Sequence, residues 1–162
     1  MNPNQVLAVA KKEVDAAYKE GANNDNKYGT WYGNMNHVPW CAQFVSWCFD
    51  QAGSKELHGI QTKYGFHNCD AGLAYFKKRG QLVEAKDAQP GDIVFFNFDG
   101  NPATAEHVGI VYVNQIDKHN LVTFEGNTSN ISGSANGDGC YKMNRAYGSR
   151  IAGIARPQWS TT

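Results

Sequence analysis

Apolar residues in the first half of the chain recur at intervals of three and four, which is the period of an amphipathic helix. Three segments carry this pattern: about Asn2 to Lys19, about Trp40 to Gln51, and Asp70 to Lys78. The first segment opens with the residues of a capping box, Asn2 and Gln5. Gly21, Gly53 and Gly80 follow the three segments, and glycine commonly ends a helix. We therefore predict three helices.

Beyond Gly80 the apolar period changes to two, which is typical of strands. Six short runs rich in β-branched and aromatic residues follow: 81–84, 92–98, 107–113, 120–125, 140–143 and 151–155. Residues 126–139 are rich in glycine, serine and asparagine and are expected to form a long flexible connection. Helices first and strands afterwards predict an α+β fold, with N-terminal helices packed on an antiparallel sheet of about five to six strands.

The second predicted helix begins with a thiol, because Cys41 follows Pro39 and Trp40. At a helix start, unpaired backbone N–H groups and the positive end of the helix dipole favour a thiolate over a thiol. Cys41 is therefore a candidate nucleophile. The alternative is that Cys41 is a small buried apolar residue, as many free cysteines are.

A reactive thiolate needs a base, and a third group that orients the base. His107 begins a predicted strand at the edge of the core, whereas the other four histidines fall in loops, turns and irregular segments. Glu125 ends the predicted strand at 120–125, and Asn127 follows two residues later. With a period of two, both side chains would project to one face of the strand and could orient an imidazole. The alternative for this pair is an ordinary strand end that faces solvent.

Aromatic residues precede the candidate nucleophile. Trp31 and Tyr32 lie in a stretch rich in glycine and asparagine, and Trp40 adjoins Cys41. These rings would form the wall of a substrate groove. Alternatively, they cover the core beneath a long loop.

Composition excludes several classes of function. The chain of 162 residues has 15 basic and 15 acidic side chains and no long basic run, so it lacks the positive surface of a nucleic-acid-binding protein. No apolar run approaches the length of a membrane span, and the first residues lack the pattern of a signal peptide. The four cysteines have neither the spacing of a zinc site nor that of a disulfide framework, so we expect free thiols.

Four segments together resemble the CHAP family, the cysteine, histidine-dependent amidohydrolases/peptidases: residues 39–48, 90–96, 107–111 and 125–127. Residues 27–33 are similar to the segment that precedes the cysteine in CHAP domains of bacteriophage endolysins. The resemblance implies a single papain-like catalytic domain, related to the NlpC/P60 superfamily, over residues 1–162 with a core at about 4–157. By position, Cys41 would be the nucleophile, His107 the general base, Glu125 the residue that orients the imidazole, and Asn127 an accessory polar partner.

The implied function is hydrolysis of an amide bond in the peptidoglycan of Gram-positive bacteria, by an amidase or an endopeptidase that forms an acyl-enzyme. The backbone N–H of Cys41 would meet the oxyanion, and a second donor is not identified. Gln43 is expected on the helix surface, with a role as that donor as the alternative. The alternatives are a cysteine amidase acting on a soluble peptide conjugate and a non-catalytic wall-binding module. The sequence does not choose among the peptidoglycan bonds, and it leaves the host and the oligomeric state open.

The resemblance also carries expectations about partners and location. Some CHAP endolysins bind calcium in an aspartate-rich loop before the cysteine, but Asp25 is the one acid between Gly21 and Cys41. We therefore expect no required metal, with a weak Ca²⁺ site around Asn24, Asp25 and Asn26 as the alternative. The expected partner is peptidoglycan, with no nucleic acid and no membrane, alone or with a separate cell-wall-binding domain or subunit. The protein would be made in the host cytoplasm without a signal peptide and would act on the wall after release.

Overall fold

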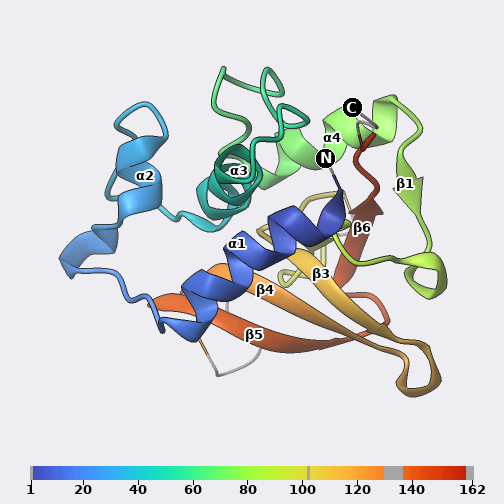
Figure 1. Cartoon of the computed structure of the whole chain (residues 1–162). Coiled ribbons are helices and arrows are strands. Elements are labelled where there is room, and N and C mark those ends of the chain that lie inside the picture. Colours follow the sequence, from blue (N-terminus) through green and yellow to red (C-terminus); the bar gives the residue numbers. More distant parts are fainter. Residues whose placement is uncertain (1, 102, 130–136, 160–162) are drawn as a thin grey trace.

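The computed structural model describes residues 2–101, 103–129 and 137–159, and Figure 1 shows their arrangement. Four α-helices span Pro3–Asp15 (α1), Lys27–Trp31 (α2), Cys41–Gln51 (α3) and Cys69–Lys78 (α4). Six strands span Leu82–Val83 (β1), Ile93–Phe96 (β2), His107–Gln115 (β3), Asn120–Thr128 (β4), Gly139–Ala146 (β5) and Ile151–Ala155 (β6). The three helices predicted from the period, and all six strand runs, are therefore confirmed, with shifted ends.

The sheet is antiparallel throughout, with the strand order β1-β6-β2-β3-β4-β5. Helices α1, α3 and α4 lie on one side of it (Figure 1), and α3 packs over β3 and β4. This arrangement is the predicted α+β fold, of the papain-like type related to NlpC/P60. It brings the start of α3 next to the two strands that carry the other candidate site residues.

The first helix begins as predicted and ends early. The side chain of Asn2 accepts from the N–H of Gln5, and the Gln5 side chain accepts from the N–H of Asn2, so the capping box is complete. However, α1 ends at Asp15 rather than near Lys19. Ala17 has a left-handed backbone (φ 54°), and the chain then pairs with the start of β5, where the N–H of Cys140 donates to the carbonyl of Tyr18. Pairing with the sheet replaces the last helical turn.

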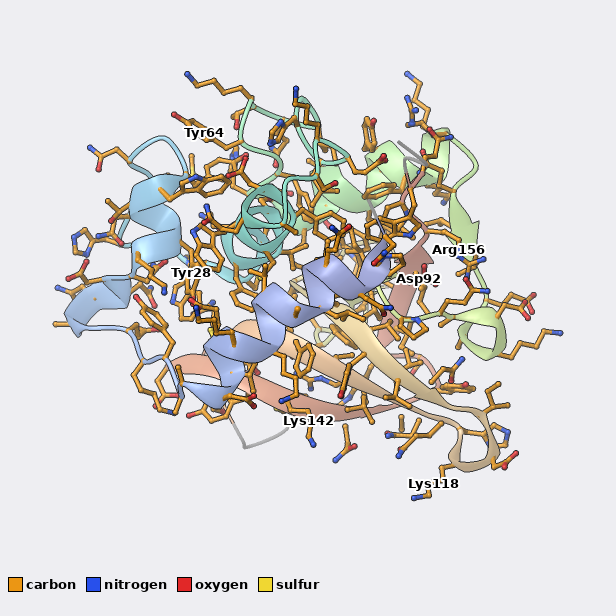
Figure 2. The ribbon with its side chains drawn as sticks, viewed as in Figure 1. Tyr28, Tyr64, Asp92, Lys118, Lys142 and Arg156 are labelled. Atoms are coloured by element: carbon orange, nitrogen blue, oxygen red, sulfur yellow. The ribbon has the colours of Figure 1, made fainter. Side chains whose placement is uncertain are left out.

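The segment predicted as a loop before Cys41 contains the short helix α2. The Asn26 side chain caps it by accepting from the N–H of Gly29 at 2.7 Å, which is why asparagine-rich sequence begins a helix here. Tyr28, on α2, is fully buried (labelled in Figure 2), and its ring stacks on that of Trp40, just before α3. This aromatic contact holds α2 against the first turn of α3.

Apolar residues pack on both faces of the sheet. The larger cluster joins the helices to one face and includes Phe44, Phe49, Phe95 and Phe124. A smaller cluster on the other face is centred on Val94 and Val111. The strands at the centre of the sheet therefore read as nearly continuous apolar runs, because both faces are covered.

An ion pair links the start of β2 to the end of the adjacent strand β6. Asp92, just before β2, accepts from Arg156, just after β6, at 2.9 Å, and Figure 2 shows the two side chains side by side. Asp92 also accepts from the N–H of Gln89, so it fixes the turn at Pro90 and Gly91. Within the described residues, no helix has the length and apolar character needed to cross a membrane.

The predicted flexible connection at 126–139 is shorter at both ends than expected. Strand β4 continues through Thr128, and β5 begins at Gly139. Residues 130–136 of that prediction lie outside the described residues.

Candidate active site

Cys41 is the first residue of α3, as the sequence predicts. The first helical hydrogen bond runs from the N–H of Phe44 to the carbonyl of Trp40, so the preceding backbone N–H groups have no partner within the helix. The N–H of Ala42 interacts with the Cys41 sulfur and favours its ionised form. Only 4% of the Cys41 surface is exposed.

His107 is the first residue of β3 and is fully buried. Its ring lies beside two aromatic neighbours, since the ring centroids of Phe96 and Phe98 stand 5.8 Å and 6.0 Å from it in roughly parallel planes. Nδ1 makes no hydrogen bond of normal geometry to the described residues. Even so, the ring and the Cys41 sulfur are close enough for each to shift the pKa of the other.

Glu125, on β4, forms a hydrogen bond with the other ring nitrogen of His107. Nε2 of His107 lies 2.7 Å from Oε1 of Glu125. The carboxylate also accepts from the Thr123 hydroxyl at 2.5 Å and from two nitrogens of Arg145 on β5. Cys41, His107 and Glu125 are thus brought together from the three elements that the sequence predicted, and the Glu125 carboxylate fixes the orientation of the imidazole.

Arg145 was missed by sequence reasoning. It is nearly buried, and Nε donates to Oε2 of Glu125 at 2.8 Å. Its guanidinium also lies over the rings of Phe96 and Phe98. The sequence contains no pattern that identifies it, because the contact depends on how β5 pairs with β4.

The charges of these groups shift their pKa values. Burial opposes ionisation of Glu125, but hydrogen bonds from Arg145 and the charge of His107 outweigh it and lower the Glu125 pKa to about 2. Burial likewise opposes protonation of His107, yet the charge of Glu125 and the interaction with Cys41 raise the His107 pKa to about 9. At neutral pH the imidazole is therefore a cation beside a carboxylate.

The pKa of the Cys41 thiol lies well below its ordinary value. A hydrogen bond with Cys69 is the largest cause; burial acts in the opposite direction, and His107 and the helix start add to the lowering. The two sulfurs are 3.7 Å apart. The sequence analysis did not single out Cys69, and the structure places it against the candidate nucleophile.

Asn127 makes no hydrogen bond to the imidazole. Its backbone is left-handed (φ 54°), and the pairing of β4 with β5 is irregular between Glu125 and Thr128. Alternation therefore fails after Glu125, and the Asn127 amide, although buried, has no hydrogen-bond partner among the described residues. The bulge breaks the alternation on which the predicted orienting pair of Glu125 and Asn127 was based, so a role for Asn127 beside the imidazole stays a prediction.

Two of the three predicted groove aromatics belong to the core. Tyr32 and Trp40 are 1% and 0% exposed. The Tyr32 hydroxyl lies 3.2 Å from Nδ1 of His67, and the Trp40 indole N–H donates to Glu20. Trp31 is half-buried and packs on Tyr32 and Tyr64. The structure therefore favours the alternative for Tyr32 and Trp40, in which the rings cover the core.

The Cys41 side chain is not openly exposed, since only 4% of the residue surface is accessible. His107 and Glu125 are fully buried, and Gln43, expected on the helix surface, is fully buried with an amide that has no described partner. This follows because α3 is covered by the sheet, α1 and α2. A hollow of about 500 Å³ lies beside Phe98 and Arg145.

The weak Ca²⁺ site considered around Asn24, Asp25 and Asn26 stays untested, and two of its oxygens accept hydrogen bonds from the protein. Oδ1 of Asp25 accepts from the Asn36 amide at 2.6 Å, and Oδ1 of Asn26 caps α2. Over residues 2–101, 103–129 and 137–159, no three histidine, cysteine, aspartate or glutamate side chains gather as metal ligands. That no metal is required stays a prediction.

Comparison with known protein families shows that residues 31–127, more than half of the chain, match the family described as the CHAP domain. This range includes Cys41, His107, Glu125 and Asn127. Searches of curated proteins and of solved structures returned no match.

Proposed function

This chain belongs to the CHAP family, and on that premise we propose that it is a cysteine-dependent hydrolase of an amide bond in peptidoglycan. Amidase or peptidase activity related to peptidoglycan is the general activity of the family. The observation that carries the proposal for this chain is the placement of Cys41 near His107, with the Glu125 carboxylate behind the imidazole; the pKa shifts of these groups favour an ionised Cys41–His107 pair. Such a pair supplies a nucleophile and an acid at neutral pH.

The proposed reaction begins when the Cys41 thiolate attacks the scissile carbonyl carbon. The carbonyl oxygen becomes an oxyanion, for which the free backbone N–H groups at the start of α3 are the nearest donors on the same element. His107 then gives its proton to the leaving amine as the C–N bond breaks, which leaves an acyl-enzyme. The neutral imidazole next takes a proton from water, and hydroxide addition to the thioester releases the acid and restores the ion pair.

Glu125 and Arg145 have supporting parts in this proposal. The Glu125 carboxylate stabilises the imidazolium and holds its orientation, and Arg145 keeps that carboxylate ionised despite burial. Because Cys41 is 4% exposed, a substrate reaches the sulfur only after neighbouring side chains move. The proposal therefore includes local opening at the start of α3.

A Cys41→Ala variant tests the proposal. Purified Gram-positive cell walls are incubated with each protein, and turbidity is followed together with the new amines released. We expect a loss of at least about 10³-fold with Cys41→Ala, since removal of a nucleophile leaves little of the rate. Cys48→Ala, on the same helix, serves as the matched control and should stay near wild-type activity. Undiminished release of amines by Cys41→Ala would rule the proposal out.

The bond and the biological setting are separate proposals. Mass spectrometry of the released fragments distinguishes a muramoyl-alanine amide, a stem-peptide bond and a cross-bridge bond. We propose an endolysin that is made in a host cytoplasm and reaches the wall after release, on the similarity of residues 27–33 to the corresponding segment in such enzymes. Wall binding without new amines would instead indicate a binding module, and cleavage limited to soluble peptides would indicate a different amidase.

A further inference from the structure

Two helix starts converge on the Cys41 sulfur. Cys41 is the first residue of α3 and Cys69 is the first residue of α4, and the two helices lie on the same side of the sheet (Figure 1). Their sulfurs are 3.7 Å apart and within hydrogen-bonding geometry. The exposed fractions of the two residues are 4% and 8%, so this contact is shielded from solvent. A hydrogen bond in such surroundings is stronger than one in water.

The start of α4 is held in place from two sides. The Asn68 side chain caps the helix by accepting from the N–H of Ala71, and Gln61 accepts from the N–H of Asn68. Oδ1 of Asp70 accepts from the N–H of Ala105 at 2.6 Å, two residues before His107. Cys69 is therefore fixed relative to the segment that leads into the imidazole.

The neighbours of each sulfur decide which one donates. The Cys41 sulfur faces the His107 cation and the N–H of Ala42, both of which favour a thiolate. The contact with Cys41 and burial raise the pKa of Cys69, and the nearby carboxylates of Asp70 and Glu106 add to the effect. The shared proton therefore stays on Cys69, and its S–H donates to Cys41.

We propose that Cys69 is a positioning residue, whose S–H donates a hydrogen bond to the Cys41 sulfur and holds it ionised and oriented for attack. The proposal rests on the function proposed above for the role of that thiolate, but the hydrogen bond itself requires no substrate. Cys69 forms no bond to the substrate and loses no proton in the reaction. Its effect is exerted through Cys41.

Titration of the Cys41 thiolate tests this role. The ultraviolet absorbance of the thiolate and the rate of alkylation by iodoacetamide are measured against pH, with Cys41→Ala as the blank. Cys69→Ala removes the donor, so we expect the midpoint of the Cys41 titration to rise by about one pH unit. Cys69→Ser keeps a donor and should return the midpoint most of the way to the wild-type value. Cys69→Val fills the space without a donor and replaces the alanine variant if that variant fails to fold.

The control is Cys140→Ala, which removes another buried thiol that contacts a polar group, the Tyr28 hydroxyl. Its midpoint should equal that of the wild type. A midpoint unchanged in both Cys69→Ala and Cys69→Val, or one raised equally by Cys69→Ser, would overturn the proposal and leave Cys69 as packing. If the midpoint shifts as expected in a protein that releases no amines from walls, the inference holds while the proposed function fails.

Discussion

The pKa of a cysteine thiol shifts in opposite directions at two positions of α3, the first residue of the helix and a position two turns later. Cys41 and Cys48 are both buried thiols on one helix, two turns apart. The pKa of Cys41 is lowered well below its ordinary value, and burial raises the pKa of Cys48 well above it. Burial alone therefore makes a thiol inert, and it is the donors around Cys41 that reverse the outcome.

Cys140 supports this comparison from another element. It lies at the start of β5, and burial raises its pKa to about 12 even though the Tyr28 hydroxyl is within 3.4 Å. A single neutral partner does not overcome burial there. At Cys41 a cation, a helix start and a second thiol act together.

Among changes that leave both Cys41 and His107 in place, the largest effect is expected from Glu125→Gln, which keeps the shape of the side chain and removes its charge. The His107 cation then loses its carboxylate partner, and Arg145 is left buried beside an amide. We expect peptidoglycan hydrolysis to fall by about 10²-fold or more, and the His107 pKa to drop from its value of about 9. Rates measured on purified walls across pH check both effects.

Glu84→Gln, on an exposed glutamate, is the matched control and should change neither the rate nor its pH dependence. If Glu125→Gln kept the wild-type rate, and if its rate fell at the same high pH as that of the wild type, the carboxylate would have no part in holding the imidazolium. The start of α3 would then differ from its middle for reasons other than this charge.

The comparison also shows what sequence can reach. Cys41 and His107 were predicted because each begins an element, and element starts follow from local periodicity and turn residues. Cys69 and Arg145 were not predicted, because their contacts depend on how the fold brings the starts of α3 and α4 together and on the register of β5. The pairing of Asn127 with Glu125 stays a prediction, because a bulge breaks the alternation that it assumed.

The fold followed the same division. The types and order of the main helices and strands came from periodicity, whereas the ends moved wherever a tertiary contact competed. The last turn of α1 was replaced by pairing with β5, and α2 formed where Asn26 supplied a cap. The aromatic residues were ambiguous for a related reason, since a half-buried ring and a core ring have the same sequence pattern.

The pH dependence of the wild-type rate tests whether Cys41 and His107 form an ion pair. The ion pair exists at pH values above the lowered pKa of Cys41 and below the raised pKa of His107. As pH rises through about 9, the imidazolium loses the proton needed by the leaving amine, so the rate should fall about tenfold per further pH unit. Initial rates of amine release at constant ionic strength measure this limb. A basic limb near the ordinary imidazole pKa of about 6.5 would contradict the raised value.

The smallest effect on activity is expected at Cys48, the buried thiol with which Cys41 is compared. Cys48→Ala removes a fully buried sulfur that has an elevated pKa, so the cost is a small cavity of about 1–2 kcal/mol in the free energy of unfolding. Urea unfolding measures this loss, and wall hydrolysis should stay within about twofold of the wild type. Iodoacetamide should label Cys41 at the same rate in both proteins, because the donors at the start of α3 are untouched. A Cys48→Ala variant that lost hydrolysis as completely as Cys41→Ala would mean that the middle of α3 also takes part in the reaction, and the contrast between the two thiols would no longer explain reactivity.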